Sequence, residues 1–133
     1  MKHITPAFLI TILLGCNGSI FSPDHLINPG LGEEFNLRIG QTATFNDDFS
    51  FTFEAVPGDS RCPTNVVCFW SGDAAIVLAF TNESDTLHTH LEPQEIRRDA
   101  YDIQLISLSP YPVYPEPIPQ DDYVVKLRVT RSD

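Results

Sequence analysis

Basic residues are scarce in this chain of 133 residues. It contains 8 Lys and Arg against 18 Asp and Glu, which gives a formal net charge of −10. Nucleic-acid binding relies on Lys and Arg to neutralise phosphates, so this composition excludes nucleic acid as a partner. The same charge opposes flat adsorption on an anionic lipid surface and favours a soluble domain.

The chain also lacks the short motifs that accompany common catalytic sites. It has no Gly-rich phosphate-binding loop and no Gly-x-Ser-x-Gly segment. A catalytic triad can still assemble from distant residues, so the absence lowers the odds of a hydrolase without excluding one. We therefore expect a non-catalytic protein without a cofactor.

A run of apolar residues long enough to span a membrane is missing as well. Residues 7–14 are apolar but too few for a spanning helix, which needs about 20 residues. Together with Lys2 near the start, they are typical of an export signal. Leu13, Leu14, Gly15 and Cys16 then resemble a bacterial lipobox, in which the chain is cleaved before the cysteine and the cysteine is lipidated. The alternative is an ordinary secretory signal with a chance cysteine.

Lipidation of Cys16 predicts an anchor in a bacterial cell envelope. More than one acyl chain is attached to such a cysteine, which makes the anchoring stable. Asn17 occupies the position at which Asp commonly retains lipoproteins at the inner membrane. We therefore expect this protein to be located at the outer membrane, facing the periplasm or the cell surface. Cleavage removes Lys2, and the remaining 7 Lys and Arg against 18 Asp and Glu give residues 16–133 a net charge of −11.

Cysteine is rare, with three residues in the chain. If Cys16 carries lipid, Cys62 and Cys68 remain as a close pair. Pro63 and Asn65 favour the turn that so short a loop needs, and an exported protein meets oxidising conditions, so we predict a disulfide. Two alternatives stay open: a redox pair, which usually has only two intervening residues, and a metal site, which needs more ligands than two cysteines.

The single tryptophan, Trp70, follows the second cysteine by two residues. In an extended segment the two share a face, and we expect Trp70 to pack over the disulfide as part of the core. Arg61 is expected to form an ion pair with Asp59 or Asp73. The alternative for this stretch is an exposed binding surface on a rigid loop, formed by Arg61, Asn65 and Trp70.

Residues 59–74 also contain a distinctive pattern: Asp59, Ser60, Arg61, Cys62 and Pro63, followed by Val67, Cys68, Trp70, Gly72 and Ala74. The pattern resembles a motif of short, uncharacterised bacterial exported proteins and lipoproteins, which read Asp-Ser-Arg-Cys-Pro, a spacer, and Cys-x-Trp-x-Gly-x-Ala. Ser71 stands where that group has a residue such as alanine. The resemblance implies a compact, exported all-β domain and implies no activity.

Alternation of apolar and polar residues dominates from residue 35 onward. It predicts strands over residues 35–39, 42–45, 49–55, 74–80, 86–91, 101–105 and 123–129. Residues 93–99 are predicted to form one helical turn. About seven short strands with little helix predict an all-β fold, a small antiparallel β-sandwich, with a small barrel as the alternative.

Residues 110–119 contain five prolines and cannot form a central strand. We expect an extended loop, which either covers a sheet edge or acts as a recognition segment. The predicted organisation is then a lipoprotein signal peptide over residues 1–15, a lipidated tether over 16–34 and a β-sandwich over 35–133. Part of the tether can add an extra edge strand.

His88 and His90 are two residues apart on a predicted strand, so they are expected to face the same side. With Asp85 and Glu92 nearby, this spacing is a weak signal for a two-histidine metal site. The alternative is a solvated outer face of a hairpin, which we favour.

These features together predict a lipid-anchored cell-envelope domain that acts as a non-catalytic binding or structural module. Its partners would be the membrane, through the anchor, and an envelope protein. A rigid disulfide loop also suits protease inhibition, as a variant of the same role. The alternative function is metal binding through His88 and His90, and redox chemistry at Cys62 and Cys68 is the least favoured.

Overall fold

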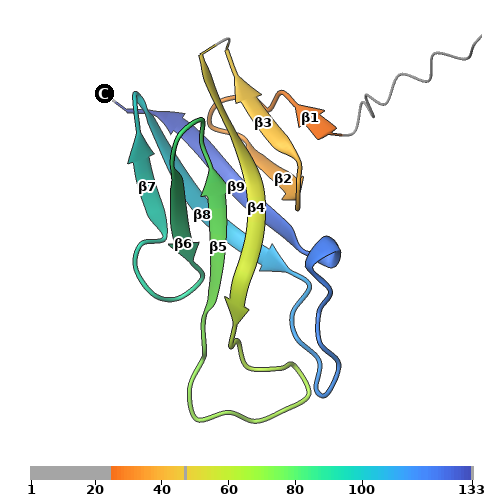
Figure 1. Cartoon of the computed structure of the whole chain (residues 1–133). Coiled ribbons are helices and arrows are strands. Elements are labelled where there is room, and N and C mark those ends of the chain that lie inside the picture. The colour runs from red at the N-terminus through yellow and green to blue at the C-terminus, as the bar shows by residue number, and fades with distance from the viewer. Residues whose placement is uncertain (1–24, 47, 133) are drawn as a thin grey trace, which may run out of the picture.

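A computed structural model describes residues 25–46 and 48–132 of the chain. Two β-sheets form the two layers of the molecule (Figure 1). One sheet has five strands in the order β1-β3-β4-β5-β6, and the other has four in the order β2-β9-β8-β7. The sheets do not close into a barrel, so the predicted β-sandwich is confirmed.

Nine strands are present in the described residues, two more than the approximate number predicted. Neighbouring strands pair antiparallel, except that β1 runs parallel to β3. A short 3₁₀ helix, Gln120–Asp122, precedes β9. The strands are β1 (Leu26–Ile27), β2 (Glu34–Arg38), β3 (Thr42–Phe45), β4 (Phe49–Asp59), β5 (Ala74–Ala79), β6 (Ser84–His88), β7 (Glu95–Arg98), β8 (Tyr101–Ser109) and β9 (Val124–Arg131).

The chain passes from one sheet to the other between β2 and β3. The sequence predicts a break at Gly40 and Gln41, and Gly40 has a φ of +85° there, which side chains with a Cβ rarely adopt. Earlier, β1 pairs with β3 as an edge strand. Part of the segment expected to be a tether therefore belongs to the sandwich, as the sequence allowed, while residues 16–24 of that segment lie outside the described residues.

Alternating side chains of both sheets fill the space between them. The largest fully buried ones come from β2, β4, β5, β6, β8 and β9: Leu37, Phe51, Phe53, Ile76, Leu78, Leu87, Ile103, Val125, Leu127 and Val129. At one end, six rings form an aromatic cluster made of Phe35, Phe45, Phe49, Phe51, Phe80 and Tyr101. This burial of apolar area is the main stabilising contribution in such a fold.

The prediction of a helical turn over residues 93–99 is wrong, because Glu95–Arg98 form β7 and pair with β8. Cross-strand contacts outweigh the helix-favouring composition. Arg97 binds Asp102 with a distance of 2.7 Å between nitrogen and oxygen, and Arg98 binds Asp85 of β6.

Several strand ends also differ from the prediction, and two of them bear on the site. β6 ends at His88 rather than at residue 91, so Leu87 is fully buried whereas Leu91 is exposed. β4 continues past Pro57 and Gly58 to Asp59, with two register shifts against β5. The longer β4 carries the chain beyond the sheet and delivers the cysteine loop, residues 60–73, to one end of the molecule (Figure 1).

Candidate functional site

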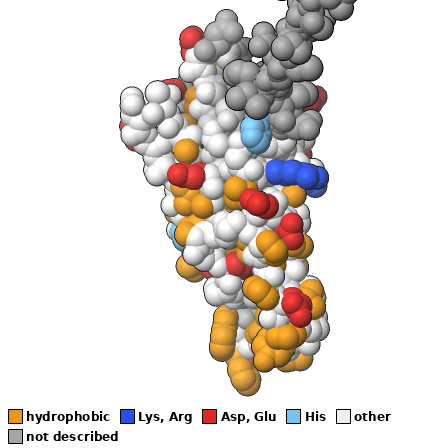
Figure 2. Space-filling model, turned by 45° about the vertical axis from the view of Figure 1, so that its right-hand side comes forward, with side chains coloured by type: hydrophobic (Ala, Val, Ile, Leu, Met, Phe, Trp, Pro, Cys, Tyr) orange, Lys and Arg blue, Asp and Glu red, His pale blue; other side chains and the backbone are white. Residues whose placement is uncertain are grey.

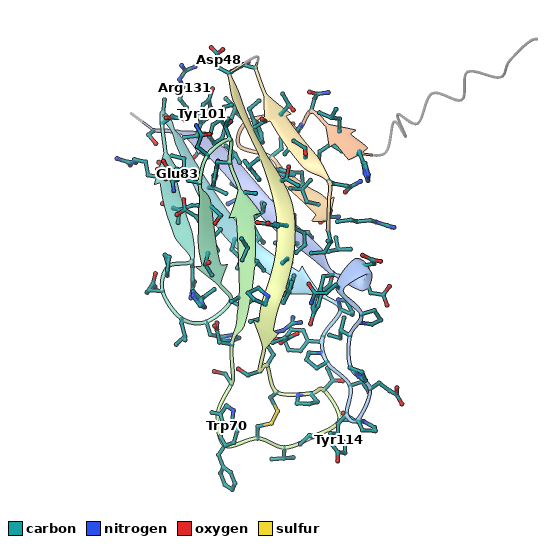
Figure 3. The ribbon with its side chains drawn as sticks, viewed as in Figure 1. Asp48, Trp70, Glu83, Tyr101, Tyr114 and Arg131 are labelled. Carbon is teal, nitrogen blue, oxygen red and sulfur yellow. A yellow bond between two sulfur atoms is a disulfide. The ribbon has the colours of Figure 1, made fainter. Side chains whose placement is uncertain are left out.

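Exposed apolar side chains gather at the end of the molecule formed by the cysteine loop and the proline-rich segment, residues 110–119 (Figure 2). We call this group the apolar tip; it consists of Val66, Val67, Phe69, Trp70, Val113 and Tyr114. Val67 is 98% exposed and Phe69 102%, and Trp70 and Tyr114 are about two thirds exposed, at 68% and 67%. Figure 3 shows Trp70 and Tyr114 at the end opposite to Asp48, Tyr101 and Arg131.

The base of the cysteine loop is closed by main-chain and hydroxyl contacts. Ser60 donates its main-chain N–H to the Asp73 carbonyl at 2.7 Å, and the Ser60 hydroxyl both donates to that carbonyl and accepts from the Asp73 N–H. Gly72 has a φ of +70°, and a Cβ there would lie 1.9 Å from the Ser60 carbonyl oxygen. Only glycine fits this close approach, which accounts for one residue of the sequence motif.

A disulfide joins Cys62 to Cys68, as the sequence predicts. It closes the part of the loop that carries Val66 and Val67, and Phe69 and Trp70 follow directly after the ring. Cys62 also donates its main-chain N–H to the Ser71 carbonyl at 3.2 Å, so the ring is tied back to the loop base. A short covalent ring of this kind leaves its side chains exposed but restricts its backbone.

Arg61 is buried, with 3% of its surface exposed, and it joins the cysteine loop to the end of β8. Its Nε and Nη2 donate to the Asp59 carboxylate at 2.8 and 2.7 Å. Nη1 donates to the carbonyl of Leu108 at 2.6 Å and Nη2 to that of Pro110 at 2.8 Å. The guanidinium also lies 4.6 Å from the ring centre of Tyr111. A buried charge with this many partners is stable only as a complete set.

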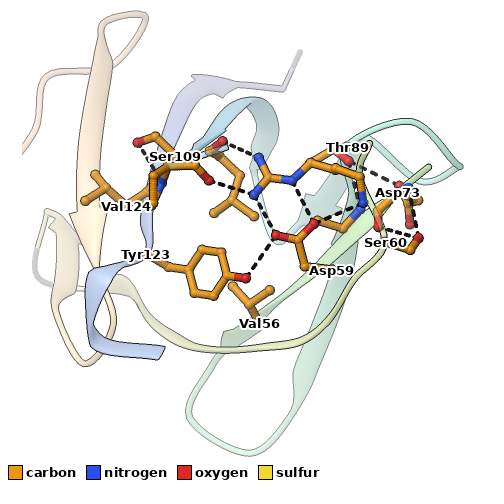
Figure 4. Close-up of polar contacts among 12 residues, drawn as sticks. Val56, Asp59, Ser60, Asp73, Thr89, Ser109, Tyr123 and Val124 are labelled. Atoms are coloured by element: carbon orange, nitrogen blue, oxygen red, sulfur yellow. Dashed lines mark hydrogen bonds and ion pairs between the residues drawn. The ribbon is translucent and has the colours of Figure 1, made fainter. Parts of the chain in front are cut away.

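Asp59 is shared between Arg61 and Tyr123, whose hydroxyl donates to it at 2.9 Å (Figure 4). Burial alone would raise the pKa of Asp59, but the hydrogen bonds from Arg61 and Tyr123 outweigh it and hold the pKa below its ordinary value. Burial and the bond to the carboxylate raise the pKa of Tyr123 to about 12. We call Asp59, Arg61 and Tyr123, with the Leu108 and Pro110 carbonyls, the Arg61 network.

The two loops of the tip are also bonded directly to each other. Asn65 donates from its side-chain amide to the Tyr114 carbonyl at 2.8 Å and accepts from the Tyr114 N–H at 2.9 Å. Thr64 donates its main-chain N–H to the Pro112 carbonyl at 3.0 Å. Farther up, the Gln120 side chain makes two hydrogen bonds with the main chain of Val56 in β4. The proline-rich segment is thereby attached along its length and supports the cysteine loop.

The three residues of the predicted binding surface have different surroundings. Arg61 forms the expected ion pair with Asp59 and is buried, so its side chain is not offered to a partner. Asn65 is exposed but is used to hold Tyr114. Trp70 is exposed, so the expectation that it packs over the disulfide as core is wrong. The loop lies beyond the last β4–β5 pair, Asp59 with Ala74, and the strands of residues 25–46 and 48–132 place no second sheet opposite it (Figure 1).

Sequence reasoning missed Val67 and Phe69 as surface residues, whereas exposed Tyr114 belongs to the segment that was expected either to cover a sheet edge or to act as a recognition segment. For Val67 the signal was present in the cysteine spacing. A short disulfide ring has to turn, which interrupts strand alternation, so an apolar residue such as Val67 inside the ring is not directed into a core. Phe69 lies outside the ring, and no local pattern indicated its exposure.

His88 and His90 are held by one carboxylate, that of Asp73. The His88 Nδ1 lies 2.6 Å from the Asp73 carboxylate, which also accepts the main-chain N–H groups of His90 and Leu91. Burial would raise the pKa of Asp73, but these bonds lower it. Because β6 ends at His88, the strand alternation that was expected to align the two histidines does not extend to His90.

No group of three or more His, Cys, Asp or Glu side chains is arranged to hold a metal ion within residues 25–46 and 48–132. The two-histidine metal site has no third ligand there and stays a prediction. The observed role of Asp73 is to connect the base of the cysteine loop to residues 88–91.

The predicted signal peptide and the lipidation site, Cys16, lie outside the described residues. In the part of the chain that the structure covers, no helix is both long and apolar enough to cross a membrane.

The chain matches no protein-family model, no curated protein and no solved structure. The resemblance to short bacterial exported lipoproteins therefore stays a prediction. The geometry gives that motif a physical meaning all the same. Six residues of the motif form what we call the frame of the tip: Asp59, Ser60, Arg61, Cys62, Cys68 and Gly72. Trp70 is exposed on this frame.

Proposed function

We propose that this protein is a lipid-anchored, non-catalytic binding module of a bacterial cell envelope, anchored through Cys16 and making contact through the apolar tip. The observation that carries the proposal is the exposure of large apolar side chains on a rigid frame. Contiguous exposed apolar patches in soluble domains mark sites of contact with proteins or membranes.

Rigidity supports a binding role for the tip. A surface that is ordered before contact loses little conformational entropy when it binds. The disulfide, the Arg61 network and the Asn65–Tyr114 bonds supply that order without covering the apolar side chains. A tip that served only the stability of the fold would have these side chains buried instead.

The anchor is supported by the lipobox at residues 13–16. The tip lies at the end of the sandwich opposite to β1, the first described strand (Figure 1). An anchor that precedes β1 would therefore be a contact separate from the tip. The outer membrane is the proposed location, because Asn17 lacks the inner-membrane retention signal.

The anchor and the contact surface are tested together in bacterial cells that express the full chain. Labelled palmitate should be incorporated, and Cys16→Ser should abolish the incorporation. A photoreactive benzoylphenylalanine in place of Phe69 should form a discrete adduct that is lost with Val67→Ser. The same group in place of Gln104, on the exposed face of β8, is the control and should form no such adduct.

Two results would overturn the proposal. Unchanged palmitate labelling in Cys16→Ser would remove the anchor. Equal adducts at positions 69 and 104, or none at either position, would remove the tip as the contact surface.

A further inference from the structure

The apolar tip combines high exposure with an almost complete lack of charge. Residues 62–72 contain no Asp, Glu, Lys, Arg or His, and residues 110–119 contain only Glu116. The two charged residues of the loop lie outside this stretch: Arg61 is buried and paired with Asp59, and Asp73 at the loop base is bonded to residues 88–91. Moving the tip out of water would therefore dehydrate few charges, and that dehydration is the main cost of placing protein surface in hydrocarbon.

Part of the polar main chain of the tip is bonded within the protein. Cys62 N–H binds the Ser71 carbonyl, Val66 N–H binds the Pro63 carbonyl and Glu116 N–H binds the Val113 carbonyl. Asn65 satisfies the N–H and the carbonyl of Tyr114. Among the described residues, Val67, Phe69 and Trp70 make no main-chain hydrogen bond. An unbonded peptide group in hydrocarbon costs several kcal/mol, so the backbone of the tip has to stay at the hydrated edge of a bilayer while its apolar side chains reach inward.

The residue types also match the boundary between water and lipid. Tryptophan and tyrosine concentrate at that boundary, where their rings are apolar and their polar atoms still reach water. Val67 and Phe69, the most exposed residues of the tip, would penetrate deepest, with Trp70 and Tyr114 beside them. The tip projects from the end of the domain (Figure 2), and a bilayer accepts a projecting shape without needing a complementary pocket.

The charge of the chain selects among membranes. At a formal net charge of −11 for residues 16–133, with 7 Lys and Arg against 18 Asp and Glu, the anchored protein is repelled by anionic lipid headgroups. A surface of zwitterionic headgroups removes this repulsion and leaves the apolar contact unopposed.

We propose that the apolar tip inserts into the interface of a zwitterionic lipid bilayer, giving the protein a second membrane contact apart from its N-terminal anchor. This inference rests on the proposed function and names the partner of its contact surface. The contact is shallow, because Glu116 and the acidic residues of the body stay in water. An apolar pocket on another envelope protein is the competing occupant.

Trp70 makes the test direct, because it is the single tryptophan of the chain and lies in the tip. Full-chain protein purified from bacterial membranes is reconstituted into phosphatidylcholine vesicles. Trp70 emission should move to shorter wavelength and should be quenched by lipids that carry bromine on their acyl chains. Emission that stays at the wavelength of a water-exposed tryptophan, without quenching by brominated lipid, would overturn the inference.

A matched pair of variants separates tip insertion from anchoring. Val67→Ser with Phe69→Ser keeps Trp70 as the probe and should abolish the quenching, because the deepest apolar groups are gone. Leu31→Ser, at an exposed apolar residue between β1 and β2, should leave the quenching unchanged. Equal quenching in wild type and in the double variant would contradict insertion through the tip. Urea unfolding of each variant confirms that the fold is intact.

Lipid charge provides a further measurement. Vesicles that contain phosphatidylglycerol should quench Trp70 less than phosphatidylcholine vesicles do, and stronger quenching would contradict the choice of a zwitterionic surface. If Trp70 stays in water while the adduct at position 69 forms on a protein, the membrane inference fails and the proposed binding module stands. If palmitate labelling is unaffected by Cys16→Ser, the anchor fails, whatever Trp70 reports.

Discussion

The aromatic cluster and the apolar tip use the same kinds of residue in opposite ways. Phe49 and Tyr101 in the cluster are 4% and 7% exposed, with ring centres 4.4 Å apart. Phe69 and Trp70 in the tip are largely exposed. The two groups lie at opposite ends of the sandwich (Figure 3).

The difference lies in what surrounds each group. The cluster is enclosed by strands of both sheets, so alternation alone buries its rings. The tip lies beyond the last strand pair, where order has to come from polar contacts and a covalent bond. The comparison shows that a region of this fold can be ordered without being buried. The predictions below test whether the order of the tip is independent of burial in the core.

Removal of the Arg61 side chain is expected to have the largest effect. Arg61→Met leaves the Asp59 carboxylate buried without its partner, and breaking a buried ion pair in this way costs about 3–5 kcal/mol of unfolding free energy. Urea unfolding measures the loss. Arg97→Met, which breaks the exposed pair with Asp102, is the control and should change stability far less. Similar losses in the two variants would mean that the Arg61 network does not stabilise the fold.

Removal of the disulfide is expected to cost less. For a ring this short, chain entropy accounts for about 2–2.5 kcal/mol when both Cys62 and Cys68 become serine. The sandwich should persist, because its core does not include the ring. Far-UV circular dichroism tests whether the sandwich persists, and urea unfolding measures the loss of stability. Loss of the β-sheet signal under native conditions would mean that the core depends on the disulfide ring.

Tyr123→Phe tests the network through pH. The change should lower the unfolding free energy by about 1.5 kcal/mol at neutral pH, which is the low end for a hydrogen bond to a charged group. The loss is small because Asp59 keeps its ion pair with Arg61. The folded-state pKa of Tyr123 is raised to about 12 from its ordinary value of 10.0, so its contribution is complete below pH 10 and is lost as pH rises towards 12. Wild type should therefore lose stability more steeply than Tyr123→Phe over this range. Parallel curves would show that the hydroxyl is not linked to folding.

Removal of a tip side chain is expected to have the smallest effect on stability. Phe69→Ala should change the unfolding free energy by no more than about 0.5 kcal/mol, as for other surface substitutions. Phe51→Ala, in the aromatic cluster, is the matched control and should cost about 3–5 kcal/mol, because it leaves a cavity. A large loss in Phe69→Ala would mean that the tip packs against the body.

The sandwich was predictable because its strands follow a period of two. Residues 49–55 and 123–129 alternate cleanly; β4 contains the first range, and β9 contains the second except Tyr123. β7 was not predictable, because residues 95–98 have a helix-favouring composition and become a strand only through pairs such as Arg97 with Asp102 across β8. Tertiary contacts of this kind leave no trace in a local pattern.

The site was predictable in its disulfide and in one ion pair. The spacing of Cys62 and Cys68 indicated the disulfide, and Arg61 with Asp59 indicated the ion pair. The Leu108 and Pro110 carbonyls that complete the Arg61 network are about 50 residues away in the chain, so no local signal could reveal them. The burial of Trp70 was predicted wrongly, because it depends on whether a second sheet faces the residue. Only the strand topology decides that.

The measurement that tests the central claim most directly is the backbone order of residues 64–70, obtained from ¹⁵N relaxation. An exposed but rigid tip predicts order parameters of about 0.85, equal to those of the strands. Values below about 0.6 are typical of a flexible loop and would contradict the account, since the frame would then fail to order the tip.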